Sequence, residues 1–208
     1  MLNRTIKIIK EVFTNPSEFF VGVRREKSIN NVLIFFLIMT LFYIIVTVPS
    51  IAIQNSMLLG LGEPLPPFLL GAFATIFYAA MMFIASFVTL FIFAAILHIG
   101  VYFMKGKGGI RETIKAYGYA QAPSFVFGGI ISYLMISEVT ALFALVPVVV
   151  IALWTIVLNI IGFQKLHGLT LGRSILAFLI GIAATFLIGI LFVLLMLLIA
   201  YSSGTIPV

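Results

Sequence analysis

The ionisable side chains of this chain are few, and their types limit the chemistry that it can do. The sequence has two His and six Glu, and neither Asp nor Cys. His98, His167 and Glu112 could together supply metal ligands, but their wide separation matches no known ligand spacing. There is no paired-carboxylate pattern for acid–base catalysis and no zinc-binding, nucleophile-elbow or phosphate-loop motif. The sequence therefore predicts no enzyme activity, no metal site and no cofactor.

A second set of polar side chains lies in or beside long apolar segments. Polar groups in membrane helices usually face the bundle interior or a watery cavity. If the second, third and fourth apolar segments adjoin, these side chains line a polar pocket that opens to the cytoplasm. The alternative is that Gln121, Ser124 and Asn159 only hydrogen-bond across helices near Pro123. The pocket candidates are His98, Gln121, Pro123, Ser124, Asn159, Gln164 and His167.

Five apolar segments carry these side chains, and the composition requires a bilayer around them. Hydrophobic residues make up 63% of the chain and charged residues 9%, whereas a soluble domain has about 25% charged residues. A hydrocarbon core of roughly 30 Å needs about 20 helical residues to cross it, and lipid offers no partner for an unpaired backbone group. The sequence therefore predicts an all-α polytopic membrane protein, a five-helix transmembrane bundle with spans at 31–53, 72–103, 116–137, 141–163 and 175–200.

The twelve Lys and Arg residues set the expected orientation. All of them lie before the first span, after the second or after the fourth. Short segments rich in these residues stay in the cytoplasm, so the N-terminus is expected inside and the C-terminus outside. Anionic lipid headgroups explain the net charge of +6 better than nucleic acid does, because no soluble domain could hold a duplex. We thus divide the chain into a cytoplasmic segment (1–30), a transmembrane domain (31–200) and a short external tail (201–208).

Three features of the spans have consequences for packing. Pro123 removes a backbone donor and predicts a bend or break in the third span. The apolar run 68–103 is longer than the bilayer is thick, so it forms either one protruding helix or a cap followed by a span. Small residues recur every fourth position of the last span, which lets another helix approach closely. We expect this stripe to pack against a span of the same chain, with homodimerisation as the alternative: Ala177, Gly181, Thr185 and Gly189.

The first 30 residues have the pattern of an amphipathic helix followed by a break. Leu2, Ile6, Ile9 and Phe13 recur at helical spacing, with basic residues between them. Such a helix lies in the membrane interface. The residue before a proline avoids helical geometry, so the helix is expected to end near residue 15 and a second one to follow. The alternative is a solvated leader with a few buried aromatic residues.

Three clusters of residues resemble motifs of the Yip-domain family, the Ypt/Rab-interacting membrane proteins. The first cluster is similar to a short proline-centred motif ahead of the first span, and the second to a Tyr-Gly-Tyr stretch that enters the third span. The third is similar to residues that prokaryotic members carry before the fifth span. In order, the clusters are Asn15-Pro16 with Phe19-Phe20, then Tyr117-Gly118-Tyr119-Ala120 with Pro123, then Trp154, Gly162 and His167-Gly168-Leu169-Thr170.

The resemblance implies five spans, an N-terminus in the cytoplasm and a C-terminus outside it. Eukaryotic members act in vesicle traffic, bind Rab GTPases and assemble with one another. This chain has only 30 residues ahead of its first span and no Asp for an acidic proline motif. It therefore resembles a prokaryotic member, and a prokaryotic cell membrane is the expected location.

Two functions are compatible with these features. The first is a membrane scaffold or adaptor that recruits a cytoplasmic protein, with Asn15, Pro16, Phe19 and Phe20 as candidate partner-binding residues. The alternative is a transporter or channel for a small solute or ion that uses the polar pocket, to which the resemblance adds Tyr117 and Tyr119. Anionic lipids are expected partners in either case, and a homo-oligomer is compatible with both.

Overall fold

The computed structural model describes residues 2–58 and 67–202, and in these ranges the chain is almost entirely helical. Four helices are long and apolar enough to cross a membrane: α3 (Asn30–Leu58), α4 (Pro67–Phe103), α7 (Glu138–His167) and α8 (Leu171–Ser202). Four are shorter: α1 (Leu2–Thr14), α2 (Pro16–Arg24), α5 (Ile110–Ala120) and α6 (Ala122–Leu134). The all-α prediction is confirmed. Of the expected tail (201–208), residues 201 and 202 still belong to α8, and the rest lies outside the described residues.

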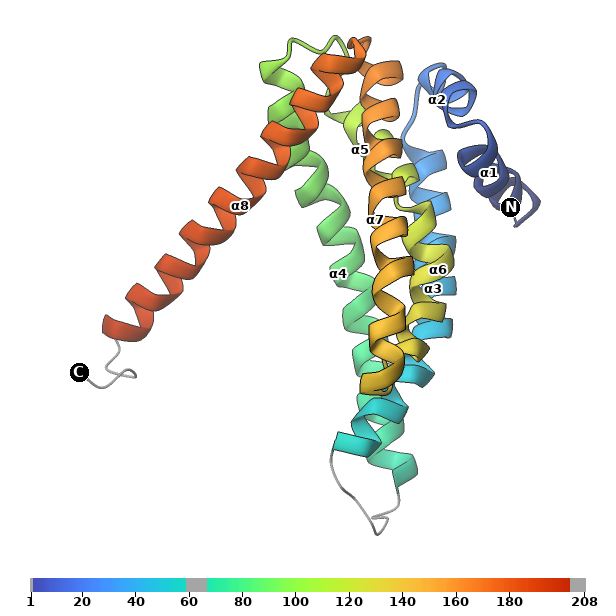
Figure 1. Ribbon diagram of the computed structural model, residues 1–208, viewed down its shortest axis with the longest axis vertical. Helices are drawn as coiled ribbons and strands as arrows, with labels where there is room; N and C mark the ends of the chain where they lie inside the picture. Colours follow the sequence, from blue (N-terminus) through green and yellow to red (C-terminus); the bar gives the residue numbers. More distant parts are fainter. Residues whose placement is uncertain (1, 59–66, 203–208) are drawn as a thin grey trace.

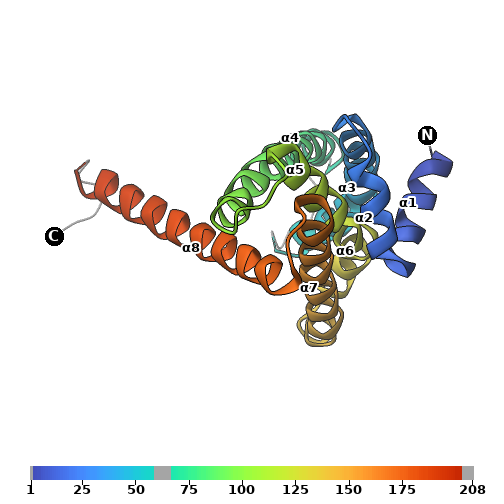
Figure 2. The same cartoon turned by 90° about the horizontal axis from the view of Figure 1, so that it is seen from above.

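The helices α3, α4, α6 and α7 run side by side and form the body of the molecule (Figure 1). α5 lies above α6 and contacts α4 and α7. The pair α1 and α2 covers one flank at the same end, and α8 leaves on the opposite side, as the view from above shows (Figure 2). The core of buried apolar side chains is concentrated where α2, α3, α4, α5 and α7 meet.

The third expected span is two helices instead of one. α5 ends at Ala120 and α6 begins at Ala122, with Pro123 in its first turn. Proline is tolerated there because its missing N–H would have no intrahelical partner. The break predicted near Pro123 is confirmed. With 11 and 13 residues, the two helices are about 17 and 20 Å long, so each alone is shorter than a hydrocarbon core of roughly 30 Å.

The second apolar run forms a single helix. α4 is continuous over 37 residues, which corresponds to about 55 Å. The choice left open by the sequence, one long helix or a cap followed by a span, is thereby decided for the long helix. It begins at Pro67, the last of the prolines that precede the run.

Among the described residues, α8 packs against the rest of the molecule only through its first part. Its buried residues are Ser174, Ala177, Phe178 and Gly181. A Cβ atom at Gly100 of α4 would overlap the carbonyl of Ala177, and one at Gly181 would lie 3.0 Å from the Cα of Leu97. From residue 186 to residue 199 all side chains are exposed.

The residues of the small-residue stripe of α8 therefore lie in two different environments. Ala177 and Gly181 pack against α4, as expected. Thr185 is half-buried, and its hydroxyl donates to the carbonyl of Gly181 in its own helix. Gly189 has open space around it. This corrects the expectation of one continuous packing face, because α8 has already diverged from α4 at that position (Figure 1).

Candidate functional site

The segments that carry the Lys and Arg residues meet at one end of the molecule, which we call the cation-rich end: residues 2–29, 104–115 and 164–173 (Figure 1). Hydrogen bonds join parts of it that are far apart in sequence. The backbone N–H of Lys107 donates to the carbonyl of His167 over 2.9 Å. The ammonium of Lys115 donates to the carbonyl of Glu26 over 2.6 Å.

Both histidines belong to one hydrogen-bonded chain at this end. His98 Nδ1 lies 2.8 Å from Thr113 Oγ1, and that oxygen lies 3.1 Å from His167 Nε2. His167 Nδ1 lies 3.0 Å from the carbonyl of Gly108. Thr113 and His167 are fully buried and His98 is half-buried.

The direction of this chain follows from its last member. A carbonyl can only accept, so His167 Nδ1 carries the proton and, in a neutral ring, Nε2 is an acceptor. The Thr113 hydroxyl must then donate to His167, and it accepts from His98 Nδ1–H. Both rings are thus held in the Nδ1–H form, and the network ties α4, α5 and α7 to the connection between α4 and α5.

That connection packs closely against the end of α7. A Cβ atom at Gly108 would lie 2.6 Å from His167 Nδ1, so only glycine leaves room for the ring. α7 itself ends at His167 and is capped by Gly168, whose φ of 65° is left-handed and suits a residue without a side chain. The sharp turn into α8 begins there.

An ionic cluster that the residue pattern did not reveal lies beside the histidines. The Lys115 side chain is 1% exposed, and its ammonium lies 3.5 Å from Glu112 Oε2. Glu26, whose carbonyl accepts from Lys115, also pairs with Arg4 over 3.2 Å. Glu112 is therefore engaged by a lysine and does not complete a ligand set with the histidines. Its spacing of three residues from Lys115 was a signal for a helical ion pair.

The aromatic pair Phe19 and Phe20 is buried, which corrects the expectation that it forms a docking surface. Phe19 packs edge-on against Tyr119, with ring centroids 5.0 Å apart. Phe20 is fully buried and would lie 3.4 Å from a Cβ atom at Gly162. The physical reason is that α2 folds back onto α5 and α7 and places its apolar face inside. Asn15 remains exposed and Pro16 is half-buried.

The three motif clusters that lie far apart in sequence thus converge at the cation-rich end. Phe19 of the first cluster contacts Tyr119 of the second. Gly162 of the third would place a Cβ atom 2.9 Å from Ala116, directly before the Tyr-Gly-Tyr stretch. The family model described as Yip1 domain matches residues 10–204. The chain belongs to the Yip1 domain family. No curated protein and no solved structure shows a significant match to it.

Family membership and the four long apolar helices together make this an integral membrane protein. In this Yip1 domain, the family-like motifs serve the packing of α2, α5 and α7. Gly118, between the two tyrosines, would place a Cβ atom 2.6 Å from Val32, so α5 approaches α3 as closely as a glycine allows. The motif residues therefore act first as contacts between helices.

The remaining polar candidates of the Yip1 domain occupy separate environments. Tyr117 stacks on Phe93, with nearly parallel rings whose centroids are 6.0 Å apart. Asn159 is buried and its Nδ2 donates to the carbonyl of Thr155 in its own helix. Its Oδ1 has no hydrogen-bond partner among the described residues, so the alternative of a bond across helices is not seen there. Gln121, Ser124 and Gln164 are half-buried. Of the whole set, only His98 and His167 are linked by the hydrogen bonds described here, which corrects the expectation of one shared polar pocket.

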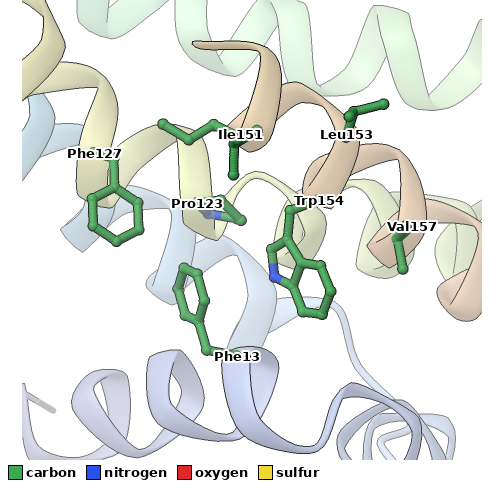
Figure 3. Close-up of a pocket in the computed structure, with 8 residues that line it drawn as sticks. Phe13, Pro123, Phe127, Ile151, Leu153, Trp154 and Val157 are labelled. Atoms are coloured by element: carbon green, nitrogen blue, oxygen red, sulfur yellow. The ribbon is translucent and has the colours of Figure 1, made fainter. Parts of the chain in front are cut away.

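An apolar groove lies beside these residues, between α1, α6 and α7 (Figure 3). Its volume is about 440 Å³. Phe13 of α1 and Phe127 of α6 contact each other edge-on, with ring centroids 5.8 Å apart. The groove is lined by Phe13, Pro123, Phe127, Val150, Ile151, Leu153, Trp154 and Val157.

The expected apolar stripe of α1 is divided between this groove and the exterior. Phe13 lines the groove, whereas Leu2 and Ile6 are 65% and 56% exposed. The face of α1 that docks on the protein carries Thr5, Ile8 and Val12. Two apolar side chains are thus left facing outward beside the basic ones, which is the pattern of a helix in a membrane interface.

Proposed function

We propose that this Yip1 domain protein is a membrane scaffold or adaptor, whose helices α1 and α2 form a fixed basic docking surface on the cytoplasmic side. The observation that carries the proposal is the anchoring of this helix pair by Phe20, Val12 and Val23, all buried. The ion pair of Arg4 with Glu26 adds a further link. A surface held in one conformation loses less entropy when a partner binds.

The outer face of this helix pair defines the chemistry of its partner. Residues 1–30 contain six cations and three carboxylates. Lys7, Lys10, Arg24 and Arg25 are exposed, and so is Asn15 at the junction of the two helices. Such a surface attracts anionic headgroups and an acidic patch on a cytoplasmic protein.

The proposal includes a topology of five crossings in a prokaryotic cell membrane. α5 and α6 together make the third crossing, the N-terminus is inside and the C-terminus outside. It is supported by the gathering of the basic segments at one end of the molecule and by the rule that such segments stay in the cytoplasm. No catalytic step forms part of the proposal.

Photo-crosslinking in cells tests the docking surface. A photoreactive amino acid at Asn15 should capture a cytoplasmic protein, and one at Ile45, which is 72% exposed on α3, should not. Arg24→Glu combined with Arg25→Glu should abolish capture, because like charges repel an acidic partner. Lys105→Glu with Lys107→Glu is the matched control at the other basic connection.

Flux measurements in sealed vesicles complete the test. We expect no solute or ion flux above that of protein-free vesicles. Capture that the Arg24 and Arg25 changes leave intact would contradict the proposed surface. Reproducible flux that Asn159→Leu abolishes in folded protein would replace the scaffold function with transport.

A further inference from the structure

We propose that the apolar groove between α1, α6 and α7 binds one acyl chain of an anionic phospholipid of the cytoplasmic leaflet. The inference deepens the function proposed above, since it depends on α1 lying at the cytoplasmic interface. It adds a discrete lipid site to the general attraction between a basic surface and a membrane.

The groove opens on a face that lipid must contact. Val150, Leu153 and Val157 line it and are 59%, 58% and 38% exposed. Its walls come from two helices of the bundle, while Phe13 of α1 covers its third side (Figure 3). An acyl chain there would be shielded by protein on three sides, unlike a chain in the surrounding bilayer.

One polar atom in the wall of the groove lacks an acceptor in the described part of the chain, and the ester region of a phospholipid would supply one. Trp154 Nε1 is buried and has no hydrogen-bond partner within the described residues. In Figure 3 this nitrogen is on the side of the indole that faces Pro123 and Phe13. An indole N–H only donates, and buried tryptophans usually find an acceptor. The ester carbonyl oxygens of a phospholipid are acceptors at the boundary where its acyl chains begin.

A cation one helical turn from Phe13, which lines the groove, suits an anionic headgroup. Lys10 lies three residues before Phe13 on α1, hence on the same side of that helix. It is exposed and forms no ion pair within the described part of the chain, whereas Arg4 pairs with Glu26 and Lys7 with Glu11. Lys10 is thus available for a phosphate or another anionic group of the lipid.

The sequence offers a direct reporter, because Trp154 is its single tryptophan. Purified full-length protein is reconstituted in phosphatidylcholine vesicles. A small fixed fraction of the lipid is phosphatidylglycerol or phosphatidylcholine brominated in the acyl chains. Bromine quenches indole fluorescence on contact. We expect the anionic brominated lipid to quench Trp154 more than the zwitterionic one at the same fraction.

Two variants separate the site from general contact with lipid. Lys10→Gln should weaken the preference for the anionic lipid about fivefold, which corresponds to about 1 kcal/mol for one cation near an anionic surface. Lys107→Gln, on the connection between α4 and α5, should leave the preference unchanged. Val157→Phe should fill the groove and reduce quenching by both brominated lipids.

The outcomes distinguish this inference from the scaffold function. Equal quenching by the two lipids, or a preference that Lys10→Gln does not alter, would overturn the anionic site. Weak quenching by both lipids in unaltered protein would overturn it as well and show that something else, such as a second copy of the chain, covers the groove. Neither result affects partner capture at Asn15, and loss of that capture leaves the quenching measurement valid.

Discussion

Thr113 illustrates how a single hydroxyl can hold several helices together. It accepts from His98 on α4 and donates to His167 on α7, while its own backbone belongs to α5. Both imidazole nitrogens would have to find other partners if the hydroxyl were lost. The residue is fully buried, so water is not a ready substitute.

Thr113→Val should therefore destabilise the fold although it preserves the shape of the side chain. We expect the free energy of unfolding to fall by about 1 to 3 kcal/mol, because a buried histidine nitrogen is left unpaired. The measurement is a denaturation midpoint in detergent. Thr113→Ser keeps the hydroxyl and should lie close to the unaltered protein, and equal midpoints for Val and Ser would show that the network is energetically unimportant.

Lys115 gives a second test at this scale. Removing one partner of a buried ion pair commonly costs about 3 to 5 kcal/mol. The Glu112 side chain is 26% exposed, so water stabilises the remaining carboxylate in part. We therefore expect Lys115→Met to lower the free energy of unfolding by about 1 to 3 kcal/mol. Adding Glu112→Gln should recover part of the loss. A double variant no better than the single one would exclude a coupling between the two side chains.

Among the helices, the contact of α8 with α4 depends on close approach at two glycines. Gly181→Leu should separate the two backbones and cost about 1 to 3 kcal/mol, the usual range for overpacking. Gly189→Leu should be tolerated, because that residue faces open space. Leu187→Ala, on an exposed part of α8, is a further control in the same thermal melt. A Gly189→Leu variant as unstable as Gly181→Leu would mean that the far half of α8 is packed in the membrane.

The helix pair α1 and α2 should come loose when its main anchor is removed. Phe20 is fully buried, and replacing a buried phenylalanine by alanine commonly costs about 3 to 5 kcal/mol. Phe20→Ala should therefore speed tryptic cleavage at Arg24, Arg25 and Lys27 in detergent-solubilised protein. Ile6→Ala, at an exposed position, should not. Unchanged cleavage of the Phe20 variant would show that the remaining contacts suffice to hold the pair.

At the scale of the whole molecule, topology is open to a direct measurement because the chain contains no cysteine. Single cysteines at Ser56 and Ser203 should react with an impermeant reagent in intact cells. Those at Ser28 and Thr170 should react only after permeabilisation, since both lie within segments that carry basic residues. Labelling of Thr170→Cys from outside would overturn the five-crossing arrangement.

Periodicity and composition were sufficient for the helices but not for what each helix contacts. The long apolar runs and the break at Pro123 follow from local rules, and the structure agrees with them. The burial of Phe19 and Phe20 does not follow from local rules, because an aromatic pair near a membrane suits an exposed surface and a buried anchor equally well. Its burial depends on α2 folding back onto Tyr119, a contact across about a hundred residues. Thr113 and Lys115 were missed for the same reason, since their importance comes from neighbours on other helices.

The divergence of α8 gives the molecule a mechanical lever. The helix is held near its start and extends about 30 Å beyond Gly181 at 1.5 Å per residue. A rotation of about 10° at that fulcrum moves the free end by about 5 Å, if the helix is treated as a rigid rod. This pivot at Gly181 lies about 20 Å along α8 from the turn at Gly168, which is next to the histidine network. A tilt of the packed part of α8 about Gly181 would thus be carried to its free end, with a displacement about one and a half times that at the turn.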